Sequence, residues 1–527
     1  MAASQAKKIG MASLIMMTSV FLSRVIGLVR EMVISHVVGA NAAVDAYQIA
    51  FVLPEILNHV LASGFLSITF IPIFNEYLGK EDEREGWRIF SIIMTVFGGI
   101  LACMVGIAMV FALQLVHIIA PSLEDPQVIH MAVKMTRIVL PAQLFFFAGG
   151  LFMAVQYAKE RFFLPALAPL IYNVGIILGG LVLGRRLGME GFAWGVLGGA
   201  FLGNFFVQWI GAASVGMRYS PSFFFRHEKF KTYVQVTIPF MLGLSLTFST
   251  EFLLKFFGSS LPEGSIARLN YAFRIMLILV GFFGQAVGVA AYPFLSRLVS
   301  QGKKAEMAEL LDNTLKFMAI VIPFSVLFIV LRKEIIRLLL QHGAFTAQDT
   351  AQTASLLMFF SIGAIAFAGQ TIVSRGFYAL QNTLYPTVVT SITVICCIPL
   401  FYASTAYLGS NGLALAASLS AVLQVAVLYV MWRRKINLKA SSTVGVFYLK
   451  ILLMSGVIGG VLEWAKAIIP SLSASGTLVT DLVTCMGVGT MFLFFLFAFA
   501  FIFKLTELQE MLRRIGAKAG IASRGKA

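Results

Sequence analysis

The fold of this chain is decided by two stretches of sequence that match at a few positions and a constant offset. Residues 156–173 read QYAKERFFLPALAPLIYN, and residues 377–394 read FYALQNTLYPTVVTSITV, at a constant offset of 221 positions. A shared offset across two apolar segments and the loop between them is not expected by chance, so the chain is predicted to contain an internal repeat. The matching pairs include Tyr157 with Tyr378, Ala158 with Ala379, Pro165 with Pro386 and Gly191 with Gly412.

The composition around this repeat is that of a polytopic membrane protein. Of the 527 residues, 59% are hydrophobic and only 12% are charged, whereas soluble domains carry about 25% charged residues. Apolar runs of about 20 residues, the length that crosses a bilayer, recur from end to end. The net charge of +16 is spread over short loops. We attribute it to the Lys and Arg that gather in cytoplasmic loops and expect no nucleic-acid partner.

About fourteen membrane spans are predicted, all helical, because backbone exposed to lipid must satisfy its own hydrogen bonds. The repeat then relates six spans to six in the same orientation, which is typical of a two-lobed transporter. We expect an N-lobe over 1–217, a C-lobe over 218–440, and two further spans with a basic tail over 441–527. The predicted spans are 9–36, 43–75, 89–119, 128–157, 162–184, 191–216, 232–257, 266–296, 310–331, 350–378, 384–407, 411–432, 446–469 and 479–504.

The distribution of basic residues predicts the orientation. With the N-terminus inside, the inside loops hold most of the loop Lys and Arg, and both termini are expected to be cytoplasmic. The main exception is the basic cluster at 332–337, which this orientation places outside. Lys7 and Lys8 before an apolar run resemble the start of a signal peptide. The run continues through Arg24 without a cleavage pattern, so we expect a retained first span.

The first span contains the stretch SRVIGLVRE at 23–31, which places two arginines and a glutamate inside the membrane at a cost in free energy. Charged side chains inside a membrane are functional candidates by default. Arg24 and Glu31 are seven residues apart and share one stripe of the helix, whereas Arg30 points elsewhere on an ideal helix. Gly27 lies between the arginines and permits a bend, so we expect it to act as a hinge that lets Arg24 and Arg30 face one cavity.

The second span, DAYQIAFVLPEILNHV, carries a polar stripe of its own. Gln48, Glu55 and His59 fall on one face, with Asn58 beside them. Pro54 is expected to kink this helix and to serve as a second hinge. We predict that the stripe lines the same cavity as the two arginines.

Later spans add further candidates. Arg274 and Asn270 lie one turn apart in the eighth span, and Glu251 and Lys255 lie one turn apart in the seventh. These charges could instead be structural ion pairs or side chains that snorkel to the interface. The surplus of arginine favours an anionic ligand, because the guanidinium group matches phosphate oxygens with two hydrogen bonds.

The sequence contains no pattern for catalysis or for a metal. It has no nucleophile elbow, Walker motif or HExxH, and its four cysteines and six histidines lack ligand spacing. We therefore expect a transporter and not an enzyme, with no cofactor and no metal. Coupling to an ion or to the membrane potential stays open, and Glu31 and Glu251 are the candidates for ion coupling.

Five segments together resemble the MurJ (MviN) family of lipid II flippases, of the multidrug/oligosaccharidyl-lipid/polysaccharide exporter superfamily. They occur in the family's order along essentially the whole chain. These segments are LSRVIGLVRE, DAYQIAFVLPEIL…SGFLSITFIPIF, LNYAFRIM…YPFLS, LLQHGAFTAQD and GFYALQN…YP.

The resemblance implies a multi-pass protein of the bacterial inner membrane. It would move the undecaprenyl-pyrophosphate-linked peptidoglycan precursor from the cytoplasmic to the periplasmic leaflet by alternating access. The last two spans would form a groove for the lipid tail. The family's cavity arginines match Arg24, Arg30 and Arg274, and its aspartate at the start of the second span matches Asp45. Gln48, Asn58, His59 and Glu55 are then expected at the headgroup, and we expect a monomer.

The chain also departs from the family pattern. Asn58 and Ser63 stand where members often have arginine and glutamate, and Phe273 replaces an acidic residue. The eleventh span has no acidic residue that could take part in a sodium site. Three alternatives therefore stay open. They are a flippase for another polyprenyl-linked saccharide, a cation or drug antiporter using Glu31, Glu55 or Glu251, and a binding protein without transport.

Overall fold

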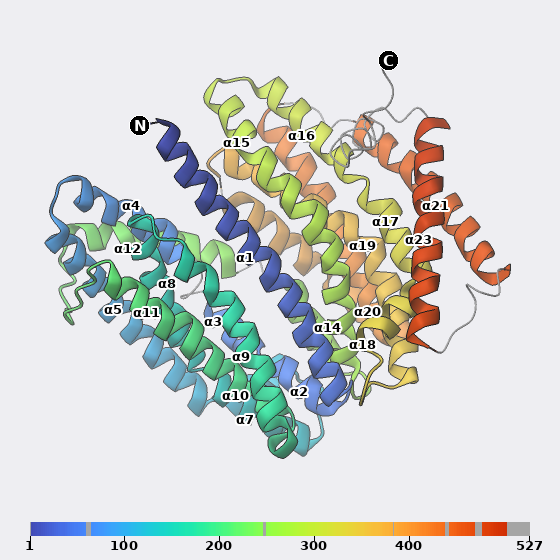
Figure 1. Ribbon diagram of the computed structural model, residues 1–527, viewed down its shortest axis with the longest axis horizontal. Helices are drawn as coiled ribbons and strands as arrows, with labels where there is room; N and C mark the ends of the chain where they lie inside the picture. Colours follow the sequence, from blue (N-terminus) through green and yellow to red (C-terminus); the bar gives the residue numbers. More distant parts are fainter. Residues whose placement is uncertain are drawn as a thin grey trace. The chain divides into compact units, whose positions relative to one another are not determined.

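The computed structural model describes residues 2–58, 65–245, 249–382, 384–437, 442–468 and 477–502, and every regular element in these ranges is a helix (Figure 1). The predicted all-helical class is therefore confirmed. His59 and Ser63, both named as candidate or unusual positions, lie outside the described residues, as does the basic tail beyond Ile502.

The chain forms two compact units. Unit 1 comprises Met1–Ala267 and Gly343–Phe345, and unit 2 comprises Arg268–His342 and Thr346–Ala527. The boundary predicted at residue 218 separates two lobes that move against each other during transport. A division into compact units does not test such a boundary, so it stays a prediction.

The described residues of unit 1 form thirteen α-helices and one π-helical segment, and the start of α14 joins them. The elements are α1 (Ala2–Val37), α2 (Ala42–Ala50), α3 (Val52–Leu57), α4 (Phe65–Gly79), α5 (Glu83–Val110), α6 (Ala112–Ile119), α7 (Pro126–Val139), α8 (Ala142–Ala158), α9 (Phe163–Leu187), α10 (Met189–Gly199), η2 (Ala200–Phe206), α11 (Val207–Ser214), α12 (Glu228–Ser245) and α13 (Ser249–Gly258).

Unit 2 contains the remaining helices, several of them long. The elements are α14 (Ser265–Leu279), η4 (Val280–Gln285), α15 (Ala286–Ser300), α16 (Lys304–Met318), α17 (Val321–Val330), α18 (Arg332–Leu340), α19 (Ala347–Ala379), α20 (Leu384–Lys435), α21 (Ser442–Ile468) and α23 (Leu478–Ile502).

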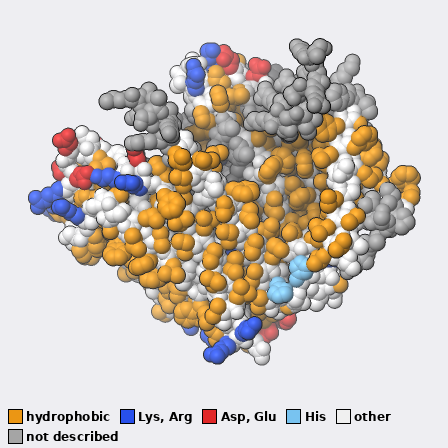
Figure 2. All heavy atoms as spheres, in the orientation of Figure 1, with side chains coloured by type: hydrophobic (Ala, Val, Ile, Leu, Met, Phe, Trp, Pro, Cys, Tyr) orange, Lys and Arg blue, Asp and Glu red, His pale blue; other side chains and the backbone are white. Residues whose placement is uncertain are grey.

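The apolar helices follow the predicted spans. Ten described stretches are long and apolar enough to cross a membrane. The longest, Leu384–Lys435, covers both the eleventh and the twelfth predicted span, and the non-helical Gly409 interrupts it between the two. The first, second and seventh predicted spans correspond to α1, to α2–α4 and to α12–α13. Figure 2 shows a face dominated by hydrophobic side chains, as expected for a surface that meets lipid. The total of fourteen stays a prediction.

The backbone confirms the internal repeat more sharply than the sequence does. Residues with positive φ are rare outside glycine, yet four pairs of them recur at the offset of 221 that the sequence indicated. Gly188 (φ 55°, ψ −132°) and Gly409 (φ 58°, ψ −136°) adopt nearly the same conformation. The other three pairs are Glu81 with Gly302, Glu160 with Gln381, and Gly216 with Asn437.

Glycines let the fifth and sixth spans, α9 and α10, pack backbone against backbone. A Cβ at Gly179 would lie 2.4 Å from the Cα of Gly195, and one at Gly175 would lie 2.5 Å from the Cα of Gly199. Only glycine permits such an approach, which is a common device for packing helices in lipid. The repeat-related hairpin does the same, because a Cβ at Gly412 would lie 1.8 Å from the carbonyl oxygen of Ser404.

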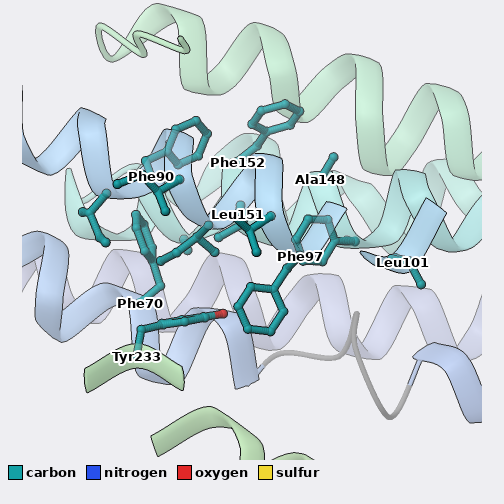
Figure 3. Close-up of a cluster of buried hydrophobic side chains, with 14 of the residues drawn as sticks. Phe70, Phe90, Phe97, Leu101, Ala148, Leu151, Phe152 and Tyr233 are labelled. Carbon is teal, nitrogen blue, oxygen red and sulfur yellow. The ribbon is translucent and has the colours of Figure 1, made fainter. Parts of the chain in front are cut away.

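The core of unit 1 is aromatic and joins α4, α5, α8 and α12 (Figure 3). Phe97 packs edge-on against Tyr233 of α12, with ring centroids 5.4 Å apart. Towards the predicted cytoplasmic end, Lys229 and Lys80 both donate hydrogen bonds to Glu76, which lowers the pKa of that carboxyl group to about 2. The seventh-span helix α12 is thereby fixed to unit 1.

Ion pairs within unit 2 involve the basic cluster at 332–337, the exception to the predicted orientation. Arg332 pairs with Glu463 at 2.9 Å, Arg337 of α18 pairs with Asp481 at 3.0 Å, and Lys466 pairs with Glu334 at 2.8 Å. These three pairs tie α18 to α21 and α23 (Figure 1). Both arginines of the cluster at 332–337 are thus paired with carboxylates on neighbouring helices, and the orientation stays a prediction.

The HGAF segment that contributed to the family resemblance contacts the end of α1. The N–H of Ala344 donates to the carbonyl oxygen of His36 at 2.9 Å. A Cβ at Gly343 (φ 62°) would lie 2.2 Å from that same oxygen, and one at Gly39 (φ 84°) would lie 2.7 Å from the oxygen of Ala344. Both positions require glycine for conformation and for space.

Candidate functional site

Arg30 is the centre of a polar cluster inside unit 1. Its guanidinium group donates to Glu31 at 2.5 Å and to the side-chain oxygen of Asn173 at 3.1 Å. The Nε atom of Arg30 and one oxygen of Glu31 are buried and have no hydrogen-bond partner among the described residues. Tyr47 and Tyr172 lie within electrostatic reach of the guanidinium group. The cluster therefore holds donor and acceptor capacity that a ligand could use.

The packing of α1 against α9 builds this cluster. The hydroxyl of Ser19 in α1 donates a hydrogen bond to the carbonyl oxygen of Ala166 in α9. This bond joins the two helices N-terminal to the cluster. Gly27 lies opposite Asn173, and a Cβ at this position would lie 3.9 Å from its Oδ1, which is an ordinary van der Waals contact. The helix α1 runs unbroken through Gly27 in this structure. The predicted bend there stays a prediction about another state.

The second span is interrupted where proline allows no regular helix. Helix α2 ends at Ala50 and α3 begins at Val52, so Phe51 separates them. Pro54 has no N–H and its ring clashes with the carbonyl of residue 50 in a straight helix. The break lies where a hinge was predicted, and its motion stays a prediction. Gln48 is buried in α2, and Asn58 is half-buried at the end of α3.

Asp45 accepts two short hydrogen bonds from a distant part of the chain. Its Oδ2 accepts from the N–H of Gly264, and its Oδ1 accepts from the N–H of Ala267, both at 2.6 Å. The carboxylate is 6% exposed. A buried anion at the start of α14 satisfies two of the four N–H groups that a helix leaves unpaired there, and it complements the helix dipole.

Glu55 accepts a hydrogen bond from Lys255 of α13 at 3.2 Å. Lys255 is 6% exposed. This pair joins the second span to the seventh within unit 1. Glu251, one turn earlier in α13, is half-buried.

The structure thus brings only part of the predicted set together. Arg30, Glu31 and the second-span residues belong to unit 1, whereas Arg274 belongs to unit 2, where it is half-buried in α14. Arg24 is on α1, six residues before Arg30, and is largely exposed. The predicted roles of all these residues, in binding, as hinges or in ion coupling, stay predictions.

Asn173 is the residue that the polar-stripe reasoning missed. It lies in the quoted repeat stretch, inside a span, and a buried amide in lipid is itself a signal of a polar neighbour. Its own N–H₂ donates to the carbonyl oxygen of Pro169 at 2.8 Å, which fixes the direction of its oxygen.

These features define a class of protein: a polytopic α-helical transporter built from a parallel repeat, with charged groups buried among its spans. The family model described as "Lipid II flippase MurJ" matches residues 34–484. The chain therefore belongs to the MurJ lipid II flippase family.

Curated relatives extend over nearly the whole chain. The "Probable lipid II flippase MurJ" of Thermotoga maritima is 28% identical over 494 residues, which is 94% of this chain and 96% of that protein. The "Lipid II flippase MurJ" of Burkholderia cenocepacia is 27% identical over 451 residues, 84% and 87% of the two chains.

Solved structures share the fold. A structure of "Lipid II flippase MurJ, inward closed conformation" aligns with a TM-score of 0.76 at 24% identity, over 92% of this chain and 99% of that one. An inward-facing multidrug resistance MATE family transporter aligns with a TM-score of 0.65 at 13% identity, over 79% and 94%. At these identities the likeness concerns the fold alone.

Proposed function

We propose that this chain is a lipid II flippase, a membrane transporter that moves the undecaprenyl-pyrophosphate-linked peptidoglycan precursor between the leaflets of the bacterial inner membrane by alternating access. Membership of the family supports this proposal along most of the chain. The observation that carries it is Arg30, an intramembrane guanidinium group with a buried unpartnered Nε.

In this proposal the pyrophosphate takes the place that Glu31 now occupies on Arg30. Phosphate oxygens accept paired hydrogen bonds from one guanidinium group, and such charge-assisted bonds are strong. Asn173 keeps the guanidinium group in position while Glu31 leaves. Arg24 and Arg274 supply further positive charge, and Gln48, Asn58 and His59 contact the headgroup.

Asp45 anchors the start of the eighth span. With both termini cytoplasmic, α2 and the start of α14 lie at the periplasmic side, where Asp45 accepts hydrogen bonds from the N–H groups of Gly264 and Ala267. Gly27 and Pro54 act as hinges, and Glu31 or Glu251 couples the cycle to an ion or to the membrane potential. The protein works as a monomer, without a cofactor, a metal or nucleic acid.

Complementation tests this function directly. Cells depleted of their lipid II flippase should grow with the wild-type chain but not with Arg30→Ala, while Arg434→Ala, which removes an exposed arginine of α20, should complement. Full growth with Arg30→Ala at normal membrane expression would contradict the assigned role.

Asn58 favours a second candidate, a flippase for a different polyprenyl-linked saccharide. It is half-buried at the end of α3, where family members often carry arginine. Both candidates use the pyrophosphate, so the headgroup must decide. Native mass spectrometry of the lipid that copurifies should show the mass of lipid II. A different polyprenyl-linked saccharide would favour the second candidate.

A further inference from the structure

Arg375 is an intramembrane arginine without a hydrogen bond or ion pair among the described residues. It lies four residues before the end of α19 and is half-buried. Two arginines near the ends of other spans of unit 2 do have carboxylate partners. Arg268 pairs with Asp349 at 3.0 Å, and Arg433 pairs with Asp312 at 3.4 Å. Arg375 therefore needs an explanation that structural ion pairing does not provide.

The stem of Arg375 lies between two helices and not in lipid. A Cβ at Gly288 of α15 would lie 3.0 Å from the Nε of Arg375 and 3.2 Å from its Cδ. The next residue, Gly376, faces the other way, because a Cβ there would lie 2.7 Å from the indole nitrogen of Trp432. Phe377 is fully buried and stacks on Tyr385. These contacts fix the end of α19 and aim Arg375 at α15.

Two tyrosines accompany the guanidinium group. Tyr378 of α19 and Tyr292 of α15 interact with it electrostatically. They come from the GFYALQN and YPFLS segments that contributed to the family resemblance, and the sequence stripes did not connect them. Tyrosine hydroxyls donate hydrogen bonds, so the three side chains present donors and no carboxylate.

The internal repeat shows that the fold does not require an arginine here. Position 154 corresponds to 375 at the offset of 221, and it carries Ala154, which is fully buried. The same place in the other half is therefore filled by a methyl group. Arg375 therefore adds a charged side chain to one half of the repeat alone, and the packing of the helices does not require it.

We propose that Arg375, with Tyr292 and Tyr378, forms a phosphate-binding site of unit 2 that holds the phosphate group of a lipid. In the predicted orientation α19 ends at the cytoplasmic side, where lipid phosphates lie. The phosphate comes either from the pyrophosphate of the translocated lipid, which rests on the proposed function, or from the phosphodiester of a membrane phospholipid, which does not.

The test is a titration of the full-length protein in detergent, followed by native mass spectrometry. One arm uses undecaprenyl pyrophosphate and the other uses phosphatidylglycerol. Arg375→Gln should weaken binding by about tenfold in at least one arm, because it removes charge-assisted hydrogen bonds to phosphate. Arg434→Gln, an exposed arginine of α20, is the matched control and should stay within about twofold.

The pattern of loss identifies the source of the phosphate. Loss in the pyrophosphate arm alone assigns the site to the substrate, loss in the phospholipid arm alone assigns it to the leaflet, and loss in both assigns a general phosphate site. A change below about threefold in both arms, or an equal loss with Arg434→Gln, overturns the proposal. If the wild-type chain binds no undecaprenyl pyrophosphate, the proposed function fails, and the phospholipid arm still decides about Arg375.

A second variant covers the case in which Arg375→Gln does not fold. Gly288→Ala keeps the charge but places a methyl group against the Nε of Arg375, so it should weaken the same arm. Wild-type affinity of a folded Gly288→Ala in both arms would then overturn the proposal.

Discussion

The ion pair between Lys466 and Glu334 offers the sharpest test of how unit 2 holds its C-terminal helices. The Nζ of Lys466 donates to Glu334 at 2.8 Å and to the carbonyl oxygen of Val330 at 3.0 Å. The side chain of Glu334 is 7% exposed and that of Lys466 is 16% exposed. Lys466→Met keeps most of the aliphatic stem and removes only the charge, so Glu334 becomes a buried carboxylate without this partner.

Removing one member of a buried pair costs about 3–5 kcal/mol, because the remaining charge is left without compensation. Lys466 retains some contact with water, so we expect the lower half of that range, about 3 kcal/mol. Replacing both members by uncharged groups of similar volume is often neutral. The double variant Glu334→Leu/Lys466→Met should therefore regain most of the loss, and only the bond to Val330, worth about 1 kcal/mol, stays lost.

The assay is reversible unfolding of the purified chain in mixed micelles of mild detergent and dodecyl sulfate. Wild type, both single variants and the double variant form a thermodynamic cycle. The reasoning is refuted if Lys466→Met lies within about 0.5 kcal/mol of wild type, or if the double variant is as unstable as the sum of the two single variants. Lys303→Met, at an exposed pair with Glu306, should change the free energy of unfolding by less than about 1 kcal/mol.

Three further outcomes follow from unit 1. Asp45→Asn should abolish growth in the depletion assay at normal expression, because an amide has one acceptor oxygen for two N–H donors; growth equal to wild type would contradict this. Gly179→Leu should prevent stable insertion, measured as monodisperse protein after detergent extraction, since even a Cβ would lie 2.4 Å from the backbone of Gly195; Gly198→Leu, at an exposed position of α10 where a Cβ would meet no atom within 4 Å, should insert. Glu31→Gln should tighten binding of phosphatidylglycerol about tenfold in native mass spectrometry, and an unchanged affinity would show that Glu31 does not compete for Arg30.

The sequence predicted the architecture well because a repeat leaves a record in both composition and backbone. The offset of 221 was visible in a few residues, such as Pro165 and Pro386, and it also placed turns such as Gly188 and Gly409 in matching conformations. Apolar length and helical period are properties of single segments, so no knowledge of tertiary contacts was needed to find the spans.

Partners between segments could not be predicted in the same way. Helical stripes place Arg30 and Glu55 on a face, but not opposite Asn173 or Lys255, which lie 143 and 200 positions further along. Side-chain pairing across helices depends on rotation and tilt that periodicity does not encode. The same limit explains the basic cluster at 332–337, whose acidic partners are on helices more than 100 residues away.

The net charge around Arg30 bears on which lipid phosphate the site would select. In the structure Glu31 neutralises Arg30, and Asn173 adds a dipole but no charge. A phospholipid phosphodiester carries one negative charge and would replace Glu31 by an equal charge, so it gains little from the exchange. A pyrophosphate carries more charge on more oxygens and can bond Arg30 while also reaching a second cation such as Arg24. We therefore expect the carboxylate of Glu31 to favour a polyprenyl pyrophosphate over the more abundant membrane phospholipids at Arg30.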